Sequence, residues 1–281
     1  MFFQKNIECH PLKKLSSWRR ISLVTWDKPK DPSVYGVLDV DATAALQLIE
    51  KLRLGTGKKI TITHLLIKAL AKTLAQFPEI NVVIRHNRLY VREHVDLFVQ
   101  VFVEEEDKAD LSGAKMRDAH LKSPVEIAGE LEQQSKKIRS GNDPNLKKTK
   151  MSLNFLPPLL LKWSIHFLGY LGFDLNINPN FLGLPSDPFG AAMLTNVGMF
   201  GLKMGWAPLV PFSRTPIVFL AGEVTDQPTV KNGVIVIQPT LNIGVTIDHR
   251  IIDGYLGGKA AGHFKKLLEN PEQLIEVSLR A

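Results

Sequence analysis

The residues best suited to chemistry lie together near the C-terminus, in the stretch TIDHRIIDGYLGG at positions 246–258. Asp248, His249, Arg250 and Asp253 fall there between an apolar run and a glycine-rich stretch. Histidine suits general-base catalysis because its unperturbed pKa is about 6.5, so the neutral imidazole is available at physiological pH. Two other interpretations stay open on residue types alone. His249 and Asp253 could be two metal ligands on one helix face, although no further ligands complete a site, and the four residues could form a structural salt-bridge cluster.

The flanking sequence predicts how the histidine is positioned. PIVFLAGEVTD at 216–226 and VIVIQPTLNIGVTID at 234–248 alternate apolar and polar residues around a KNG turn at 231–233. This pattern predicts a long β-hairpin whose second strand ends at His249. GYLGGKAAGHFKKLLENP at 254–271 predicts a closing helix directly after it.

The rest of the chain alternates strands and helices. We predict a strand from 34 that enters a helix at Asp41 or Thr43, and an amphipathic helix over 61–77 that Pro78 ends. His64, in its first turn, suits a capping or surface role. A hairpin turning at His86–Asn87, a strand over 95–105 and a polar helix over 123–139 follow. The fold class we expect is α/β, a mixed sheet flanked by helices.

Composition narrows the function classes. The 281 residues contain one cysteine, Cys9, so no disulfide can form within one chain, and no signal peptide is recognisable at the N-terminus. We therefore predict a cytoplasmic protein. The net charge of +7 permits an anionic ligand such as a cofactor phosphate, but no nucleic-acid motif accompanies it, and no nucleic-acid partner is expected. One basic cluster, interpreted as a solvated linker face, comprises Lys136, Lys137, Arg139, Lys147, Lys148 and Lys150.

One segment is unusually apolar, FLPPLLLKWSIHFLGYLGF at 155–173. Its 19 residues approach the length of a membrane span, but two prolines, Lys162, His166 and two glycines interrupt it. The interpretation we favour is a helix packed in the core or between subunits. Less favoured alternatives are a helix on the membrane surface and an apolar wall that contacts a hydrophobic substrate.

Four blocks of sequence resemble one family. TIDHRIIDGYLGGKAAGHFKKLLENPEQL resembles the C-terminal DHRxxDG signature of the 2-oxoacid dehydrogenase acyltransferases, and the related chloramphenicol acetyltransferase carries a similar HHxxxDG. LTNVGMFG at 194–201 resembles the family's ISNLGMFG stretch, and ITITHLLIKALAKTLAQFPEIN at 60–81 its long helix with an FPxxN ending. LKKLSSWRRIS at 12–22 is similar to its N-terminal segment. The resemblance covers roughly residues 10 to 275 and implies one catalytic domain over 1–281, with 155–173 as an apolar insertion.

The resemblance implies a CoA-dependent acyltransferase fold, like that of chloramphenicol acetyltransferase, built as a homotrimer with active sites between subunits. Acyl-CoA would be a substrate. His249 would remove the proton from a thiol, the Thr195 hydroxyl would stabilise the oxyanion, and Asp253 would orient the site through an ion pair with Arg19 or, our choice, Arg20. Asn196 would hold a turn and Gly254 would let the chain turn tightly. Supporting roles therefore fall to Arg20, Asn196, Asp248, Arg250 and Gly254.

The sequence departs from the family in having no recognisable lipoyl or peripheral-subunit-binding domain. The loop EEEDKAD at 104–110 resembles a lipoylation site, but no lipoyl domain surrounds Lys108, so no covalent lipoyl group is expected on this chain. The acyl acceptor would then be a dihydrolipoyl thiol on a separate protein, or another nucleophile. Two alternatives stay open, a non-catalytic trimeric scaffold and an antibiotic-type O-acetyltransferase, and an assembly larger than the trimer is compatible with all three.

Overall fold

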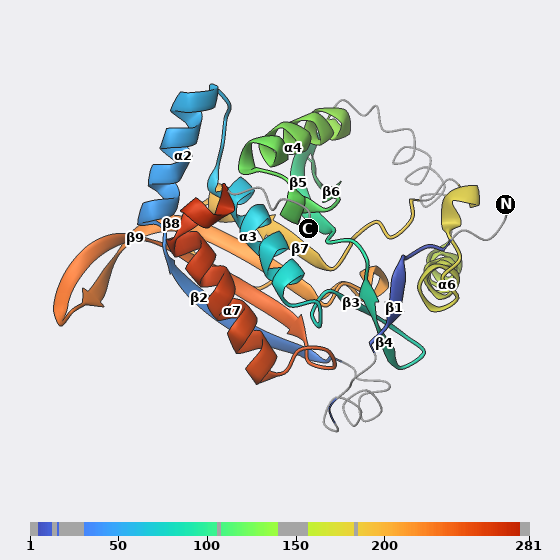
Figure 1. Ribbon diagram of the computed structural model, residues 1–281. Coiled ribbons are helices and arrows are strands. Elements are labelled where there is room, and N and C mark those ends of the chain that lie inside the picture. Colours follow the sequence, from blue (N-terminus) through green and yellow to red (C-terminus); the bar gives the residue numbers. More distant parts are fainter. Residues whose placement is uncertain are drawn as a thin grey trace.

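The computed structural model describes residues 5–12, 16, 31–105, 108–139, 157–182 and 185–275. Its centre is a six-stranded mixed sheet with the strand order β2-β9-β8-β7-β5-β6 (Figure 1). β7 is parallel to both of its neighbours, and the other pairs are antiparallel. The strands are β2 (Ser33–Asp41), β5 (Leu97–Glu105), β6 (Lys108–Met116), β7 (Ala192–Asn196), β8 (Ile217–Lys231) and β9 (Val234–Asp248). The predicted α/β class is confirmed.

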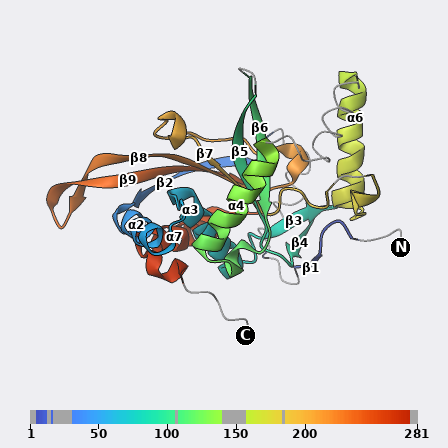
Figure 2. The same ribbon diagram turned by 90° about the horizontal axis from the view of Figure 1, so that it is seen from above.

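Four helices lie on one side of this sheet, as the view from above shows (Figure 2). They are α2 (Thr43–Thr56), α3 (Ile62–Gln76), α4 (Pro124–Arg139) and α7 (Gly254–Glu269). Helix α3 is the central one, and its apolar face is fully buried against the sheet and against α7. The helix ends before Pro78, as predicted, because proline cannot continue the ladder of backbone hydrogen bonds.

A second, three-stranded sheet lies beyond the edge of the first and has the order β1-β4-β3 (Figure 1). Its strands are β1 (Cys9–Pro11), β3 (Val82–Arg85) and β4 (Arg88–Arg92). Its hairpin turns at His86 and Asn87, which have φ angles of 45° and 57°, and the β8–β9 hairpin turns at Asn232 and Gly233. Both predicted turns are confirmed. Short helical turns are η1 (Ala119–Leu121), η2 (Tyr170–Asp174, π-helical), η3 (Pro179–Leu182), η4 (Gly198–Phe200), η5 (Pro211–Ser213) and η6 (Pro271–Leu274).

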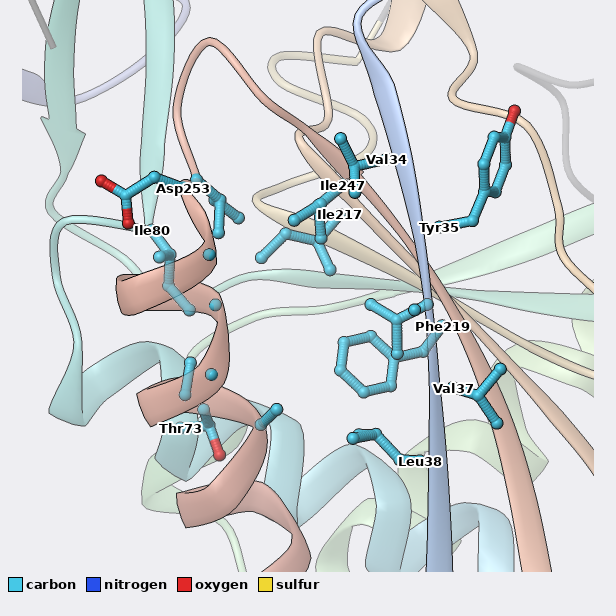
Figure 3. Close-up of a pocket in the computed structure, with 18 of the residues that line it drawn as sticks. Val34, Tyr35, Val37, Leu38, Thr73, Ile80, Ile217, Phe219, Ile247 and Asp253 are labelled. Atoms are coloured by element: carbon cyan, nitrogen blue, oxygen red, sulfur yellow. The ribbon is translucent and has the colours of Figure 1, made fainter. Parts of the chain in front are cut away.

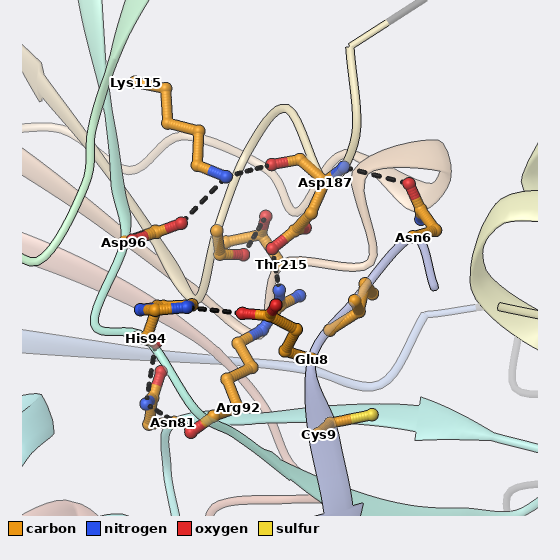
Figure 4. A network of polar contacts seen from close by, with 12 residues as sticks. Asn6, Glu8, Cys9, Asn81, Arg92, His94, Asp96, Lys115, Asp187 and Thr215 are labelled. Carbon is orange, nitrogen blue, oxygen red and sulfur yellow. Dashed lines mark hydrogen bonds and ion pairs between the residues drawn. The ribbon is translucent and has the colours of Figure 1, made fainter. Parts of the chain in front are cut away.

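A buried polar network ties the small sheet to the main one (Figure 4). Arg92 on β4 forms an ion pair with Asp187, and both side chains are almost fully buried. Lys115 on β6 lies 2.8 Å from the Asp96 carboxylate and donates to the Asp187 carbonyl at 2.8 Å. Removing one member of such a group leaves an uncompensated buried charge, which is strongly destabilising. The network therefore fixes the loop that leads into β7.

The apolar segment forms helix α6 (Pro158–Gly169), which stands away from the sheet and its helices (Figure 2). Trp163 is 69% exposed and Phe167 is 61% exposed. Of the two locations predicted for this helix, packing in the core is therefore wrong, and packing between subunits stays a prediction. Within the described residues, no helix is both long and apolar enough to cross a bilayer.

His64 is held neutral at the start of α3. The backbone N–H of Thr61 donates to its Nδ1 at 2.9 Å, which confirms the predicted capping role. The side chain is only 8% exposed, and burial lowers its pKa to about 4 because desolvation penalises the charged imidazolium. Because its side chain is buried, His64 does not have the alternative surface role.

We predict that His64 makes the fold acid-sensitive. Its pKa is about 4 when folded and 6.5 when unfolded, so the unfolded chain binds the proton first as the pH falls. The neutral His64 therefore contributes roughly 3 kcal/mol to the free energy of unfolding above pH 6.5, and this contribution is lost as the pH falls towards 4. Urea unfolding at a series of pH values measures this loss in wild type and in His64→Gln, which retains a capping side chain. The variant should lose less stability over this range, and His10→Gln, at an exposed position, should behave like wild type. Equal losses in wild type and His64→Gln would contradict the assignment.

Candidate active site

His249 is the first residue after β9 and is fixed by backbone contacts on both sides of that strand end. Its N–H donates to the carbonyl of Pro32 at 3.0 Å, just before β2 begins. The preceding N–H, that of Asp248, donates to the carbonyl of Pro216 at 2.9 Å, just before β8 begins. The predicted position of the histidine at the end of the hairpin's second strand is confirmed.

The two charged neighbours of His249 pair with each other. Arg250 donates from Nε and Nη2 to the Asp248 carboxylate at 3.0 and 2.7 Å, and its backbone N–H donates to the same group at 2.9 Å. Asp248 is only 5% exposed, so this bidentate ion pair is largely shielded from solvent. The pair spans the residue between them and holds the turn that carries the histidine. The salt-bridge interpretation is thus correct for these two residues.

Asp253 begins the closing helix. Its Oδ1 accepts a hydrogen bond from the N–H of Leu256 at 2.8 Å, which makes it the N-cap of α7. This role was missed, although an aspartate directly before a helical pattern is a recognised capping signal. The predicted partner Arg20 lies outside the described residues. The prediction for Gly254 is wrong: its φ angle is not positive, and a Cβ there would meet no atom within 4 Å.

An apolar cavity of about 270 Å³ lies between α7 and the β2–β9 side of the sheet (Figure 3). Ile217, Phe219 and Ile247 line its sheet side, and Asp253 lies at the end nearest the histidine turn. No pattern in the sequence predicted this cavity. Among the described residues, no group of three or more His, Cys, Asp or Glu side chains is placed to hold a metal ion.

Thr195 lies near the end of β7, and its neighbour Asn196 fixes that end. The Asn196 side chain accepts from the N–H of Gly198 and donates to the hydroxyl of Thr63, both at 2.9 Å. These bonds hold the turn after β7 and tie it to the first turn of α3. The contact with Thr63 was not predicted, because the two residues are far apart in sequence.

The structure does not bring Thr195 and His249 together within one chain. Through the ladders, Thr195 pairs with Leu220 and Leu220 with Gly244, which is five residues before His249. At about 3.3 Å per residue, this places the two side chains about 17 Å apart along the sheet, with β8 between their strands. Thr195 therefore lies near the last row of β7, whereas His249 lies beyond the row in which β7 begins.

After Thr195 the chain crosses the sheet on the face opposite the helices (Figure 2). It runs so close that a Cβ at Gly244 would lie 1.8 Å from the carbonyl of Gly205, so only glycine fits there. Trp206 Nε1 donates to the Gly36 carbonyl of β2 at 2.9 Å. Five large apolar side chains of this segment are exposed, and we call them the 199–206 patch: Met199, Phe200, Leu202, Met204 and Trp206.

We predict that Asp253 contributes stability as a helix cap. Asp253→Ala should lower the free energy of unfolding by about 1 kcal/mol, because the N–H of Leu256 loses its acceptor. Asp253→Asn retains a capping oxygen without the charge and should be close to wild type. Urea unfolding of the two variants tests this. Equal destabilisation by both would show that the negative charge, not the cap, is what the fold requires.

Comparison with known proteins gives a consistent result. Residues 19–151 and 189–276 match the family described as 2-oxoacid dehydrogenases acyltransferase (catalytic domain). The acetyltransferase component of the pyruvate dehydrogenase complex from Rhizobium meliloti is 26% identical over 247 residues, covering 85% of this chain and 45% of that protein. The chain thus spans about half the length of such curated relatives.

Solved structures share the fold. The cubic core of a pyruvate dehydrogenase multienzyme complex superposes with a TM-score of 0.66 at 14% identity, over 94% of both chains. Dihydrolipoamide acetyltransferase from Azotobacter vinelandii gives a TM-score of 0.65 at 15% identity, again over 94% of both chains. The family match covers most of the chain, including the strand end at His249 and the strand of Thr195. The chain belongs to the 2-oxoacid dehydrogenase acyltransferase family, as its catalytic domain.

Proposed function

We propose that this chain is a CoA-dependent acyltransferase that exchanges an acyl group between CoA and the thiol of a dihydrolipoyl-type acceptor. The observation that carries the proposal is the fixed position of His249. Backbone bonds to Pro32 and, through Asp248, to Pro216 hold it at a strand end in a family of acyltransferases. A general base must be held in place in this way to reach one particular proton.

The proposed reaction needs one base and one hydrogen-bond donor. A thiol with a pKa of about 8.5 is mostly protonated at neutral pH, so the His249 imidazole removes its proton. The thiolate attacks the carbonyl carbon of the acyl thioester, a C–S bond forms, and the C=O electron pair moves to oxygen. The hydroxyl of Thr195 donates to this oxyanion. When the oxyanion collapses, the original C–S bond breaks, and the departing thiolate takes the proton from His249.

The Azotobacter vinelandii enzyme supports this choice of residues. A serine, a histidine and an asparagine were investigated in its mechanism, and the asparagine follows the histidine by four residues. Asp253 follows His249 by the same distance. The serine precedes the histidine by 52 residues in that enzyme, and Thr195 precedes His249 by 54 here. A threonine hydroxyl can replace that of serine, and its methyl group restricts χ1 and helps to orient the oxygen.

We further propose that the working unit is a homotrimer in which His249 of one copy meets Thr195 of the next. Two features support a contact between copies. The two side chains lie about 17 Å apart along the sheet within one chain. The 199–206 patch exposes five large apolar side chains next to Thr195. Exposed apolar patches of this kind mark protein–protein contacts. The cubic core of the related complex makes a larger assembly a reasonable extension, with the dihydrolipoyl group on a separate protein.

Release of CoA tests the proposed activity. With a panel of acyl-CoAs and dihydrolipoamide, wild type should release CoA, and His249→Ala should abolish this release. Thr195→Ala should lower kcat by a factor on the order of 100 to 1,000, as for loss of one oxyanion donor, and Thr195→Ser should retain most activity. His10→Ala, at an exposed position on the small sheet, serves as the matched histidine control.

Each alternative outcome has a distinct meaning. CoA release that requires His249 but not dihydrolipoamide would overturn the proposed acceptor and retain the base. A well-folded oligomer that releases no CoA from any donor would contradict the catalytic proposal and favour the scaffold.

A further inference from the structure

The apolar cavity beside α7 begins close to His249 and extends away from it. The backbone N–H of His249 is bonded to the carbonyl of Pro32. Two residues further along each strand, Val34 of β2 pairs with Ile247 of β9, and both line the cavity. This end of the cavity is therefore about 7 Å along the sheet from the proposed base. The lining continues along β2 to Leu38, about 13 Å beyond Val34, so the cavity is elongated.

Alternate residues of β2 form one wall of the cavity. Val34 and Leu38 point toward α7, whereas Tyr35 and Val37 point away from it (Figure 3). Gly36 lies between the first two, so a side chain at this position would also point into the cavity. A Cβ there would meet no atom within 4 Å, and the φ angle of Gly36 is not positive. Neither close packing nor backbone conformation therefore requires a glycine here.

The opposite wall, on α7, has the same feature. Gly258 lines the cavity, a Cβ there would meet no atom within 4 Å, and its φ angle is not positive. A glycine inside a strand or a helix weakens that element, because its backbone loses more conformational freedom on folding and it packs no side chain. The two glycines thus leave open a space that ordinary side chains would fill. Such a space is unfavourable when empty, because protein interiors contain few voids larger than a water molecule.

The lining favours an aliphatic occupant. Ile217, Phe219 and Ile247 form the sheet side, and the hydroxyl of Thr73 already donates to the carbonyl of Ala69 at 2.8 Å. An ordered water needs two to four polar partners, and this lining offers few. A cavity of about 150 Å³ with similar walls binds benzene, so a cavity of about 270 Å³ holds on the order of ten carbon atoms.

We propose that this cavity holds the hydrocarbon chain of the acyl group, so that the donor is a medium-chain acyl-CoA of up to about ten carbons. This inference rests on the proposed acyl transfer and names the class of acyl group that the site accepts. The thioester carbonyl lies by His249, and the chain extends between β2 and α7 of the same subunit. Each methylene group that leaves water adds to the affinity, which therefore rises with chain length until the cavity is full.

A dihydrolipoyl group also contains an aliphatic chain, but the cavity suits it less well. Its chain ends in an amide, and burying an amide without a hydrogen-bond partner is unfavourable. An acyl chain ends in a methyl group and brings no polar group into the cavity. The apolar lining therefore favours the chain of the donor over that of the acceptor.

The dependence of CoA release on chain length tests the proposal. With dihydrolipoamide as acceptor, wild type should have a kcat/KM for octanoyl-CoA at least about tenfold above that for acetyl-CoA. Gly36→Val and Gly258→Leu fill the cavity from opposite walls, and each should lower this ratio by about tenfold or more. Gly262→Leu is the matched control, because Gly262 follows Gly258 by four residues on α7, also has open space at its Cβ, and does not line the cavity. Its ratio should equal that of wild type.

Stability and the acceptor distinguish the other outcomes. Each of the three substitutions replaces a glycine by a residue of higher strand or helix propensity, so urea unfolding should show no loss of stability. Equal kcat/KM values for the two donors in wild type, or an unchanged ratio in both cavity variants, would overturn the proposal and leave acyl transfer intact. A raised KM for dihydrolipoamide with an unchanged donor ratio would also overturn it, because the cavity would then hold the acceptor.

Binding to His249→Ala separates the cavity from catalysis. Calorimetry should show that this variant binds octanoyl-CoA at least about tenfold more tightly than acetyl-CoA, and adding Gly36→Val should remove the difference. This result, together with no CoA release by wild type from any donor, would reject the proposed function and retain the acyl-chain site. Equal binding of the two thioesters would reject the site.

Discussion

The hydrogen-bonded ladder through β7, β8 and β9 is the constraint on which the rest of the structure depends. Through β8, it aligns Thr195 on β7 with Gly244 on β9. Gly244 precedes His249, the first residue after β9, by five residues. Strands in a sheet cannot slide by single residues without turning every buried side chain to the other face, so this separation is fixed. A reaction that uses both groups must therefore take them from two copies of the chain.

Other features of the fold agree with that constraint. The segment after Thr195 crosses the sheet through the close approach at Gly244 and ends with Trp206 bonded to the edge strand β2. It thereby exposes the 199–206 patch on the face that the helices leave uncovered. The buried pair of Arg92 and Asp187 holds the loop before β7, so both ends of the strand that carries Thr195 are anchored.

Local signals predicted the elements but not their pairing. The positive φ angles that Asn87 and Gly233 readily adopt mark the two hairpin turns, and Pro78 marks the end of α3. The histidine could be placed at a strand end because the alternation stops there. The insertion of β7 between β5 and β8 has no local signal, since it depends on residues far apart in sequence. The sequence left helix α6 open between the core and a contact between subunits, because an apolar helix suits both. Only the structure shows that its sides are exposed in the single chain, which rules out the core.

Complementation between two strongly impaired variants tests the central claim most directly. His249→Ala and Thr195→Ala chains, carrying different affinity tags, would be co-expressed and the mixed oligomers isolated by both tags in turn. If each site joins His249 of one copy to Thr195 of the next, a mixed trimer regains one intact site in three, and CoA release should recover to about a third of wild type. Each variant assembled alone, and the two mixed after assembly, should release CoA at no more than about 1% of the wild-type rate. Mixed trimers that release no more CoA than either variant alone would contradict a site shared between copies.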